Sequence, residues 1–230
     1  DVVDDAEEIL HVVSSDIPVG QRVTGVVDDA RRFDHTQQHT GQHILSAAFD
    51  RAFGNRTVGF HMGADVSTID LAGPVSPIDA ARAERDANAV VWDNRQVSIR
   101  FVTAAEAATL PLRKESAREG VLRLIEVRDF DLSACGGTHV ARTGEVGLIA
   151  VTGAERFKGG SRVTFVCGGR ALRAFGELRE SVTQSVRTLS LLPAEVPAAI
   201  DRLQGEAREM RKSMRGLQEQ LARHEAIRIV

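Results

Sequence analysis

Three histidines follow one another at four-residue intervals in the segment FDHTQQHTGQHILSAAF, residues 33–49: they are His35, His39 and His43. Residues four apart stack on one face of an α-helix, so this spacing predicts a helix that carries a single stripe of imidazoles. The apolar residues after the stripe predict that the same helix also has a packed face. Such a stripe is either part of a metal site or a coincidence of solvated histidines.

A second pair of metal ligands is predicted from DLSACGGTHV, residues 131–140, where Cys135 and His139 are also four apart. Imidazole and thiolate are ligands that zinc prefers, and two paired motifs are a stronger signal than one. We therefore expect His39, His43, Cys135 and His139 to bind zinc. The alternative interpretation is a set of surface histidines with a core cysteine.

Composition limits the classes of protein to consider. The chain has 230 residues, of which 43% are hydrophobic and 27% charged, which is typical of a folded protein. Its formal net charge is −3, so a nucleic-acid partner would have to bind at local basic patches. No apolar run is long enough to span a membrane, and the acidic first residues are unlike a signal peptide. We expect a cytoplasmic protein with no membrane partner.

The order of predicted elements favours an α+β fold, a mixed two-layer arrangement of sheet and helix, because strands and helices do not alternate regularly. Ser76 and Pro77 predict the start of a helix that ends near residue 92, and Thr103 with Glu106 predicts a second, short helix. Alternating or continuous apolar runs predict the strands. These strands are expected over residues 21–28, 96–103, 120–127, 144–151 and 161–169, with a hairpin over 58–73.

The C-terminal segment has a heptad-like apolar seam, which predicts a helical arm of the coiled-coil type. The seam consists of Val196, Ile200, Leu203, Ala207, Met210, Met214, Leu217 and Leu221. A similar apolar stripe over residues 178–192 precedes it. The two stripes could pack as an antiparallel helix pair, or the helix over 196–221 could form a homodimer, and the pattern does not separate these possibilities.

The motifs HTQQHTGQHILSAAF and SACGGTHV, with GAERFKGGSRVTFVCGG at residues 153–169, resemble the editing domain of alanyl-tRNA synthetases and the free-standing alanyl-tRNA editing proteins of the AlaX type. Editing domains of threonyl-tRNA synthetases have a similar ligand pattern, but HTGQH and CGGTH favour the alanine branch. The resemblance implies hydrolysis of serine or glycine wrongly esterified to alanine tRNA, with zinc in the site. A second hydrolytic site is needed because a synthetic pocket rejects a substrate with one added hydroxyl only weakly.

The resemblance also implies a domain organisation. Residues 1–30 would be the tail of a missing or truncated N-terminal β-rich domain, since the chain has no glycine-rich segment of the GGGQ type. Residues 31–170 would form the zinc-binding editing domain, and residues 171–230 the helical arm, which would lead towards a further C-terminal domain.

Several other residues are candidates for the site. Gln42 and Thr40 could orient water or substrate, and the amides of Gly136 and Gly137 could bind an oxyanion, although polar helix contacts and a permissive turn are the simpler explanations. Candidates for substrate binding are His61, Thr68, Arg113 and Lys114. Candidates for phosphate contacts with tRNA are Arg31, Arg32, Arg156, Lys158 and Arg162, with Arg118 as a further cation.

The ligand set does not by itself determine the role of the zinc. Four protein ligands saturate a tetrahedral zinc ion, which is typical of a structural site, whereas a catalytic zinc keeps one position open. The domain could therefore be a zinc-stabilised module that binds tRNA or a synthetase without catalysis. A metal-dependent hydrolase of a small ester or nucleotide would need carboxylate-rich metal motifs, and the sequence contains none.

Overall fold

The computed structural model describes residues 2–5, 8–114 and 120–228, and it divides the chain into two compact units, Asp1–Phe33 and Asp34–Val230. Arg118 lies outside the described residues. In the first unit, strands β1 (Val2–Asp5) and β2 (Glu8–His11) form an antiparallel hairpin. The expected strand over 21–28 is wrong: these residues form no strand, and Val26 is 91% exposed. A valine-rich run becomes a strand only where a neighbour accepts its hydrogen bonds, and among the described residues none pairs with this run.

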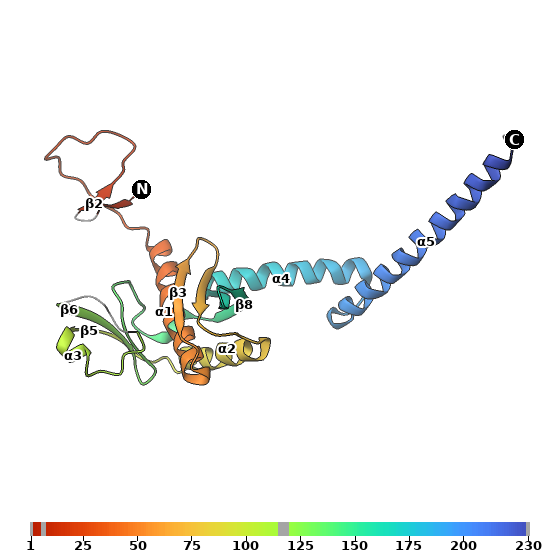
Figure 1. Cartoon of the computed structure of the whole chain (residues 1–230). Coiled ribbons are helices and arrows are strands. Elements are labelled where there is room, and N and C mark those ends of the chain that lie inside the picture. Colours follow the sequence, from red (N-terminus) through yellow and green to blue (C-terminus); the bar gives the residue numbers. More distant parts are fainter. Residues whose placement is uncertain (1, 6–7, 115–119, 229–230) are drawn as a thin grey trace. The chain divides into compact units, whose positions relative to one another are not determined.

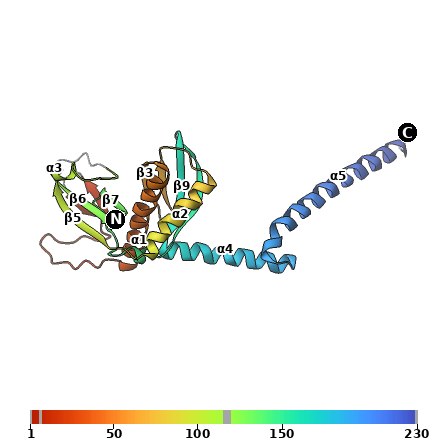
Figure 2. The ribbon, with the colours of Figure 1, turned by 90° about the horizontal axis from the view of Figure 1, so that it is seen from below.

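Helix α1 (Asp29–Phe53) confirms the helix expected from the histidine spacing. Residues 41–49 are buried on every side of the helix. Figures 1 and 2 show the reason, because in both views this part of α1 lies between the two sheets of the larger unit. The helix that carries the histidines is therefore also the centre of the hydrophobic core.

The strands of the larger unit form two antiparallel sheets, one of four strands in the order β3-β4-β9-β8 and one of three in the order β5-β6-β7. The first sheet contains β3 (Thr57–Met62), β4 (Ser67–Leu71), β8 (Ile149–Phe157) and β9 (Gly160–Cys167). The second contains β5 (Val97–Thr103), β6 (Val121–Val127) and β7 (Asp131–Ala134).

One strand begins later than expected. The pattern over 144–151 predicts a strand from Gly144, but residues Thr143–Val146 form the 3₁₀ helix η1, and β8 starts at Ile149. Gly147 lies between them with φ of 80°, a conformation that L side chains rarely adopt, and a Cβ there would lie 3.2 Å from Gly168. This close approach of two glycines ends the turn and redirects the chain into the sheet.

The core joins both sheets to α1 and to α2, which spans Pro77–Trp92. Ile44 and Phe49 of α1 are fully buried with Phe165 of β9 and Ile125 of β6. Each such side chain contributes about 1.5–3 kcal/mol of transfer free energy on burial. Helix α2 begins at the predicted cap Ser76, which forms a capping box with Asp79, and α3 (Ala104–Ala107) begins with the capping box predicted at Thr103. These elements confirm the α+β fold.

The C-terminal arm consists of α4 (Gly168–Leu189), the short η2 (Pro193–Glu195) and the long helix α5 (Val196–Arg228). The predicted seam lies on α5, but its side chains are not covered by the described residues: Met210 and Leu217 are each 66% exposed. Leu178 of α4 is 64% exposed, so the two stripes do not bury each other as a helix pair. In the part of the chain that the structure describes, no helix has the length and apolar character needed to cross a membrane.

Candidate functional site

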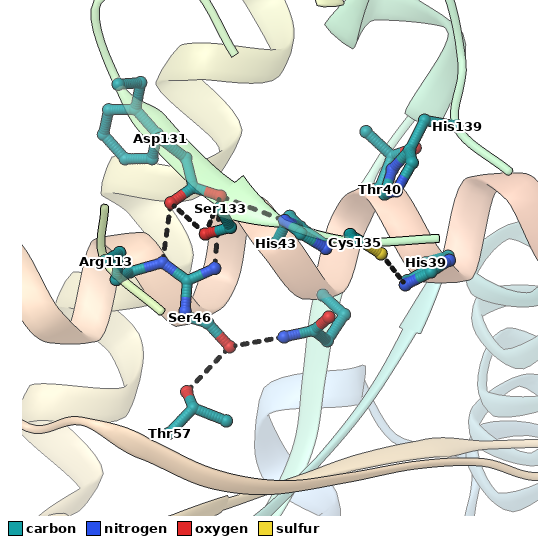
Figure 3. Close-up of polar contacts among 12 residues, drawn as sticks. His39, Thr40, His43, Ser46, Thr57, Arg113, Asp131, Ser133, Cys135 and His139 are labelled. Carbon is teal, nitrogen blue, oxygen red and sulfur yellow. Dashed lines mark hydrogen bonds and ion pairs between the residues drawn. The ribbon is translucent and has the colours of Figure 1, made fainter. Parts of the chain in front are cut away.

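The four predicted metal ligands lie together. His39 and His43 come from successive turns of α1, Cys135 follows directly after β7, and His139 comes from the loop beyond the paired glycines. One potential ligand atom from each residue lies within 4.8 Å of the others. The Cys135 sulfur is 3.3 Å from His39 Nε2, and Figure 3 shows the imidazoles gathered around it. Packing of α1 against β7 thus brings together ligands that lie about a hundred residues apart in the chain.

Hydrogen bonds determine which nitrogen of two histidines is free to bind a metal. The Thr40 hydroxyl donates to the Thr36 carbonyl at 2.9 Å and accepts the Val140 amide at 3.1 Å. It has one lone pair left, so its 3.3 Å contact with His139 Nδ1 requires the proton on Nδ1. Likewise His43 Nδ1 donates to the Asp131 carboxylate at 3.0 Å. When these rings are neutral, the Nε2 atom of each carries an unprotonated lone pair.

Two observations show that these residues fit a metal ion such as zinc. His139 Nε2 is buried and has no hydrogen-bond partner among the described residues, although buried polar atoms are normally satisfied. In addition, a Cβ added at Gly137 would lie 2.2 Å from His39 Cε1, so only glycine lets the loop approach the ring this closely. An imidazole and thiolate donor set with an orphaned buried nitrogen is the chemistry of a zinc site.

The electrostatics of the cluster keep two of its donors, Cys135 and His139, in the forms that bind a metal. Burial would raise the pKa of the Cys135 thiol, but the three surrounding histidines and the Gly137 amide outweigh it and lower the pKa to about 3. Burial, with the neighbouring histidines, lowers the pKa of His139 to about 4. Zinc binds thiolate and neutral imidazole, so both shifts favour its binding. The Gly137 amide, which the sequence suggests for an oxyanion, here stabilises the sulfur.

A buried acidic residue supports the cluster from behind. The carboxylate of Asp131, fully buried, accepts from His43 and forms two bonds with the guanidinium of Arg113, at 2.6 Å from Nε and 3.1 Å from the terminal nitrogen. Ser133 donates to the same carboxylate at 3.1 Å. Burial would raise the pKa of Asp131, but His43 and Arg113 lower it to about 2. A carboxylate behind a ligating imidazole orients the ring and strengthens it as a donor.

Parts of the chain are similar to known proteins. Residues 122–164, which include Cys135 and His139, match the family model described as the threonyl and alanyl tRNA synthetase second additional domain. The chain is 32% identical to an alanine-tRNA ligase of Methanosarcina mazei over 96% of its own length, and 32% identical to the alanyl-tRNA editing protein AlaX-L of Pyrococcus horikoshii over 88%. It is 29% identical to the alanyl-tRNA editing protein Aarsd1 of Danio rerio over 90% of its length.

The chain is therefore similar to the alanyl-tRNA editing proteins and to a region of the alanine-tRNA ligases. It spans 25% of the Methanosarcina ligase and 51% of each of the two editing proteins. The expected resemblance to these proteins is confirmed.

A pocket of about 140 Å³ opens beside the predicted metal ligands. Pockets for drug-sized ligands are roughly 300–1,000 Å³, so this one suits a small group. Gln42 lines it, and its side-chain amide donates to the Ser46 hydroxyl at 2.8 Å, which Thr57 also contacts at 2.8 Å (Figure 3). Phe60 forms another wall and stacks on the His39 ring, with centroids 5.7 Å apart.

The structure brings some predicted residues to this pocket and leaves others elsewhere. Gln42, Arg113 and Lys114 line it. His61 and Thr68 are not among its lining residues; they form a cross-strand pair between β3 and β4. Thr40 is fully buried and acts on the position of His139. Roles for all of these in catalysis or substrate binding stay predictions.

The basic residues predicted for tRNA occupy two places. Arg31 and Arg32 lie in the first turn of α1, within the unit Asp1–Phe33. Arg156, Lys158 and Arg162 lie on or beside the β8–β9 hairpin. Arg162 already forms two hydrogen bonds with Asp70 and stacks on the Phe157 ring at 3.7 Å. Its positive charge is therefore partly neutralised, whereas Arg156 is exposed on the same hairpin.

Sequence reasoning missed Asp131 and Arg123. Arg123 donates to the carbonyls of Cys135 and Gly137 at 2.7 and 2.8 Å, which holds the loop that carries the sulfur. A signal for Asp131 was present: Asp131, Ser133 and Cys135 have the two-residue spacing of one strand face. No local pattern marks Arg123, because its partners are backbone carbonyls on a neighbouring segment.

Proposed function

We propose that the chain hydrolyses the aminoacyl ester of mischarged alanine tRNA, removing serine, or glycine, from the 3′-terminal ribose at a zinc site. The observation that carries the proposal is the joint placement of His39, His43, Cys135 and His139 beside a small pocket lined by both polar and apolar residues. Sequence similarity supports the choice of substrate, because relatives of this chain bear the name alanyl-tRNA editing protein.

When bound, zinc would supply Lewis acidity to a substrate oxygen or lower the pKa of an attacking water. The residues of the chain have separate tasks around it. His39, His43, Cys135 and His139 hold the metal, while Asp131 and Thr40 orient two of the imidazoles. These tasks are compatible with a catalytic zinc if one ligand yields its position to substrate, and with a zinc that only positions the ester.

The polar wall of the pocket suits an amino acid that carries a hydroxyl. Because the Gln42 nitrogen donates to Ser46, the Gln42 carbonyl oxygen remains as an acceptor for the side-chain hydroxyl of the substrate. Alanine would leave such an acceptor without its partner, and sites built to bind a hydroxyl discriminate strongly against analogues that lack it. We therefore expect serine to be removed from the tRNA faster than alanine.

The test is the loss of ester from alanine tRNA charged with serine, glycine or alanine, measured before and after chelation and after return of zinc. Serine-charged threonine tRNA is the comparison that identifies a threonyl-type editing domain. Zinc-dependent loss of serine from alanine tRNA supports the proposal. Tight binding of that tRNA with zinc present and no loss of ester would instead identify a non-catalytic binding module.

A further inference from the structure

Two consecutive cations, Arg113 and Lys114, line the pocket beside the metal residues, but they are held in different ways. The Arg113 side chain is 13% exposed and both of its bonds go to one carboxylate, that of Asp131. Lys114 is exposed, and among the residues the structure describes it has no ion-pair partner. Backbone contacts hold both residues along β7: the Arg113 amide donates to the Leu132 carbonyl at 2.9 Å, and Lys114 forms a bridge with Ser133.

The acceptor capacity of Asp131 is used in full. An ionised carboxylate has about four lone-pair positions. Arg113 occupies two of them, and Ser133 and His43 contact the same oxygens (Figure 3). The planar fork of the guanidinium fixes the rotation of the carboxylate, and this rotation places Oδ2 against His43 Nδ1. Arg113 therefore influences the predicted ligand His43 only through Asp131.

We propose that Arg113 is a positioning residue that holds Asp131 against His43, and that Lys114 is the pocket cation that meets the anionic part of the substrate. The inference rests on the proposed function for the substrate and on the metal cluster alone for Arg113. The sequence suggests substrate binding for both Arg113 and Lys114, whereas here only Lys114 contacts the substrate. The anion that Lys114 meets is a phosphate group near the 3′ end of the tRNA, because a compact ammonium on a flexible stem binds phosphate as a point charge.

A substitution at position 113 can separate the contribution of bidentate hydrogen bonding from that of positive charge. A lysine there would keep the positive charge but could not form both bonds to Asp131. If orientation of the carboxylate is what matters, Arg113→Lys fails to replace arginine. A purely electrostatic role would be satisfied by either residue.

The experiment measures zinc affinity by competition with a chelating dye, and separately measures deacylation of serine-charged alanine tRNA. The variants are Arg113→Met, Arg113→Lys, Asp131→Asn, the double variant Arg113→Met with Asp131→Asn, and Lys114→Met as the matched control. The double variant contains no unpaired buried charge, so it tests the coupling even if Arg113→Met alone does not fold.

We expect Asp131→Asn to weaken zinc binding by about 10–100-fold, and Arg113→Met and Arg113→Lys each by about tenfold. The double variant should match Asp131→Asn within about twofold, since the effect of Arg113 passes through Asp131. Lys114→Met should keep zinc affinity within about twofold, raise KM for the charged tRNA and reduce the dependence of log affinity on log salt by about 1.

The assignment of Arg113 would be overturned if Arg113→Lys bound zinc with wild-type affinity. It would also be overturned if Arg113→Met lowered zinc affinity by the same factor in the wild-type protein and in Asp131→Asn. An unchanged KM and salt dependence in Lys114→Met would overturn the assignment of Lys114. A wild-type protein that binds zinc but removes no ester would refute the proposed function while the zinc comparison still decided the role of Arg113. A wild-type protein that binds no zinc would refute both.

Discussion

Gly137 offers a sharp perturbation of the metal cluster, because its neighbour Gly136 is a matched control. A Cβ at Gly137 would lie 2.2 Å from His39 Cε1 and 2.5 Å from Nδ1, whereas a Cβ at Gly136 would meet nothing within 4 Å. Neither glycine has a positive φ, so alanine is compatible with the backbone at both positions. The two substitutions differ only in what the new methyl group contacts.

The size of the effect follows from the geometry. Carbon atoms in contact lie about 3.5–4 Å apart, so the methyl group of Gly137→Ala requires the His39 ring to move by about 1 Å or more. Ligand distances in metal sites tolerate only about 0.2 Å, so His39 can no longer bind together with the other three residues. We expect zinc affinity to fall by at least the ~10–100-fold that loss of a supporting partner costs. Overpacking would cost about 1–3 kcal/mol of stability at the same time.

A chelator competition assay on both variants provides the test, with thermal unfolding in the absence of metal as the measure of folding. Gly136→Ala should bind zinc like the wild type. If Gly137→Ala bound zinc as tightly as Gly136→Ala, the close approach of this loop to His39 would not exist in solution, and the reasoning would be refuted.

Four further predictions concern the rest of the molecule. Cys135→Ala should lose zinc and deacylation together, as measured by metal content and ester loss; retained metal with full activity would contradict the site. Phe49→Ala should lower the free energy of unfolding in urea by about 3–5 kcal/mol, because the ring is fully buried. Hydrogen bonds from Arg162 lower the pKa of Asp70, so this pair stabilises the fold above the ordinary pKa and loses that effect as pH falls through the lowered value. Arg162→Met should therefore lower the midpoint of thermal unfolding at pH 7 more than at pH 3, and a loss that does not depend on pH would argue against the pair. Leu217→Asp should abolish any concentration-dependent dimer seen by sedimentation, and a wild type that is monomeric at every concentration would remove the expectation of a dimer through α5.

Local patterns predicted the parts of this fold that local physics determines. The histidine spacing predicted a helix because side chains four apart share a face, and the cap at Ser76 with Pro77 and the capping box at Thr103 marked two helix starts. The pairing of His39 and His43 with Cys135 and His139 was predicted from ligand chemistry.

Features that depend on distant partners were not predicted. The expected strand over 21–28 failed because strand formation needs a neighbour, which a sequence pattern does not supply. The role of Asp131 was missed because its partners Arg113 and His43 lie 18 and 88 residues away in the chain. The apolar stripes of the arm left a helix pair and a homodimer as alternatives, because spacing alone does not determine which surface covers them.

The two halves of the metal cluster belong to segments with very different access to solvent, and this has a kinetic consequence. His39 and His43 sit on a helix buried between two sheets, whereas Gly136 and Thr138 in the loop between Cys135 and His139 are exposed. Amide hydrogens of residues 41–49 should exchange only on global unfolding, and those of the loop by local opening. The helix would hold His39 and His43 in place while local opening of the loop moves Cys135 and His139. We therefore expect the rate of metal exchange to depend on the opening of a few loop residues and not on the stability of the domain.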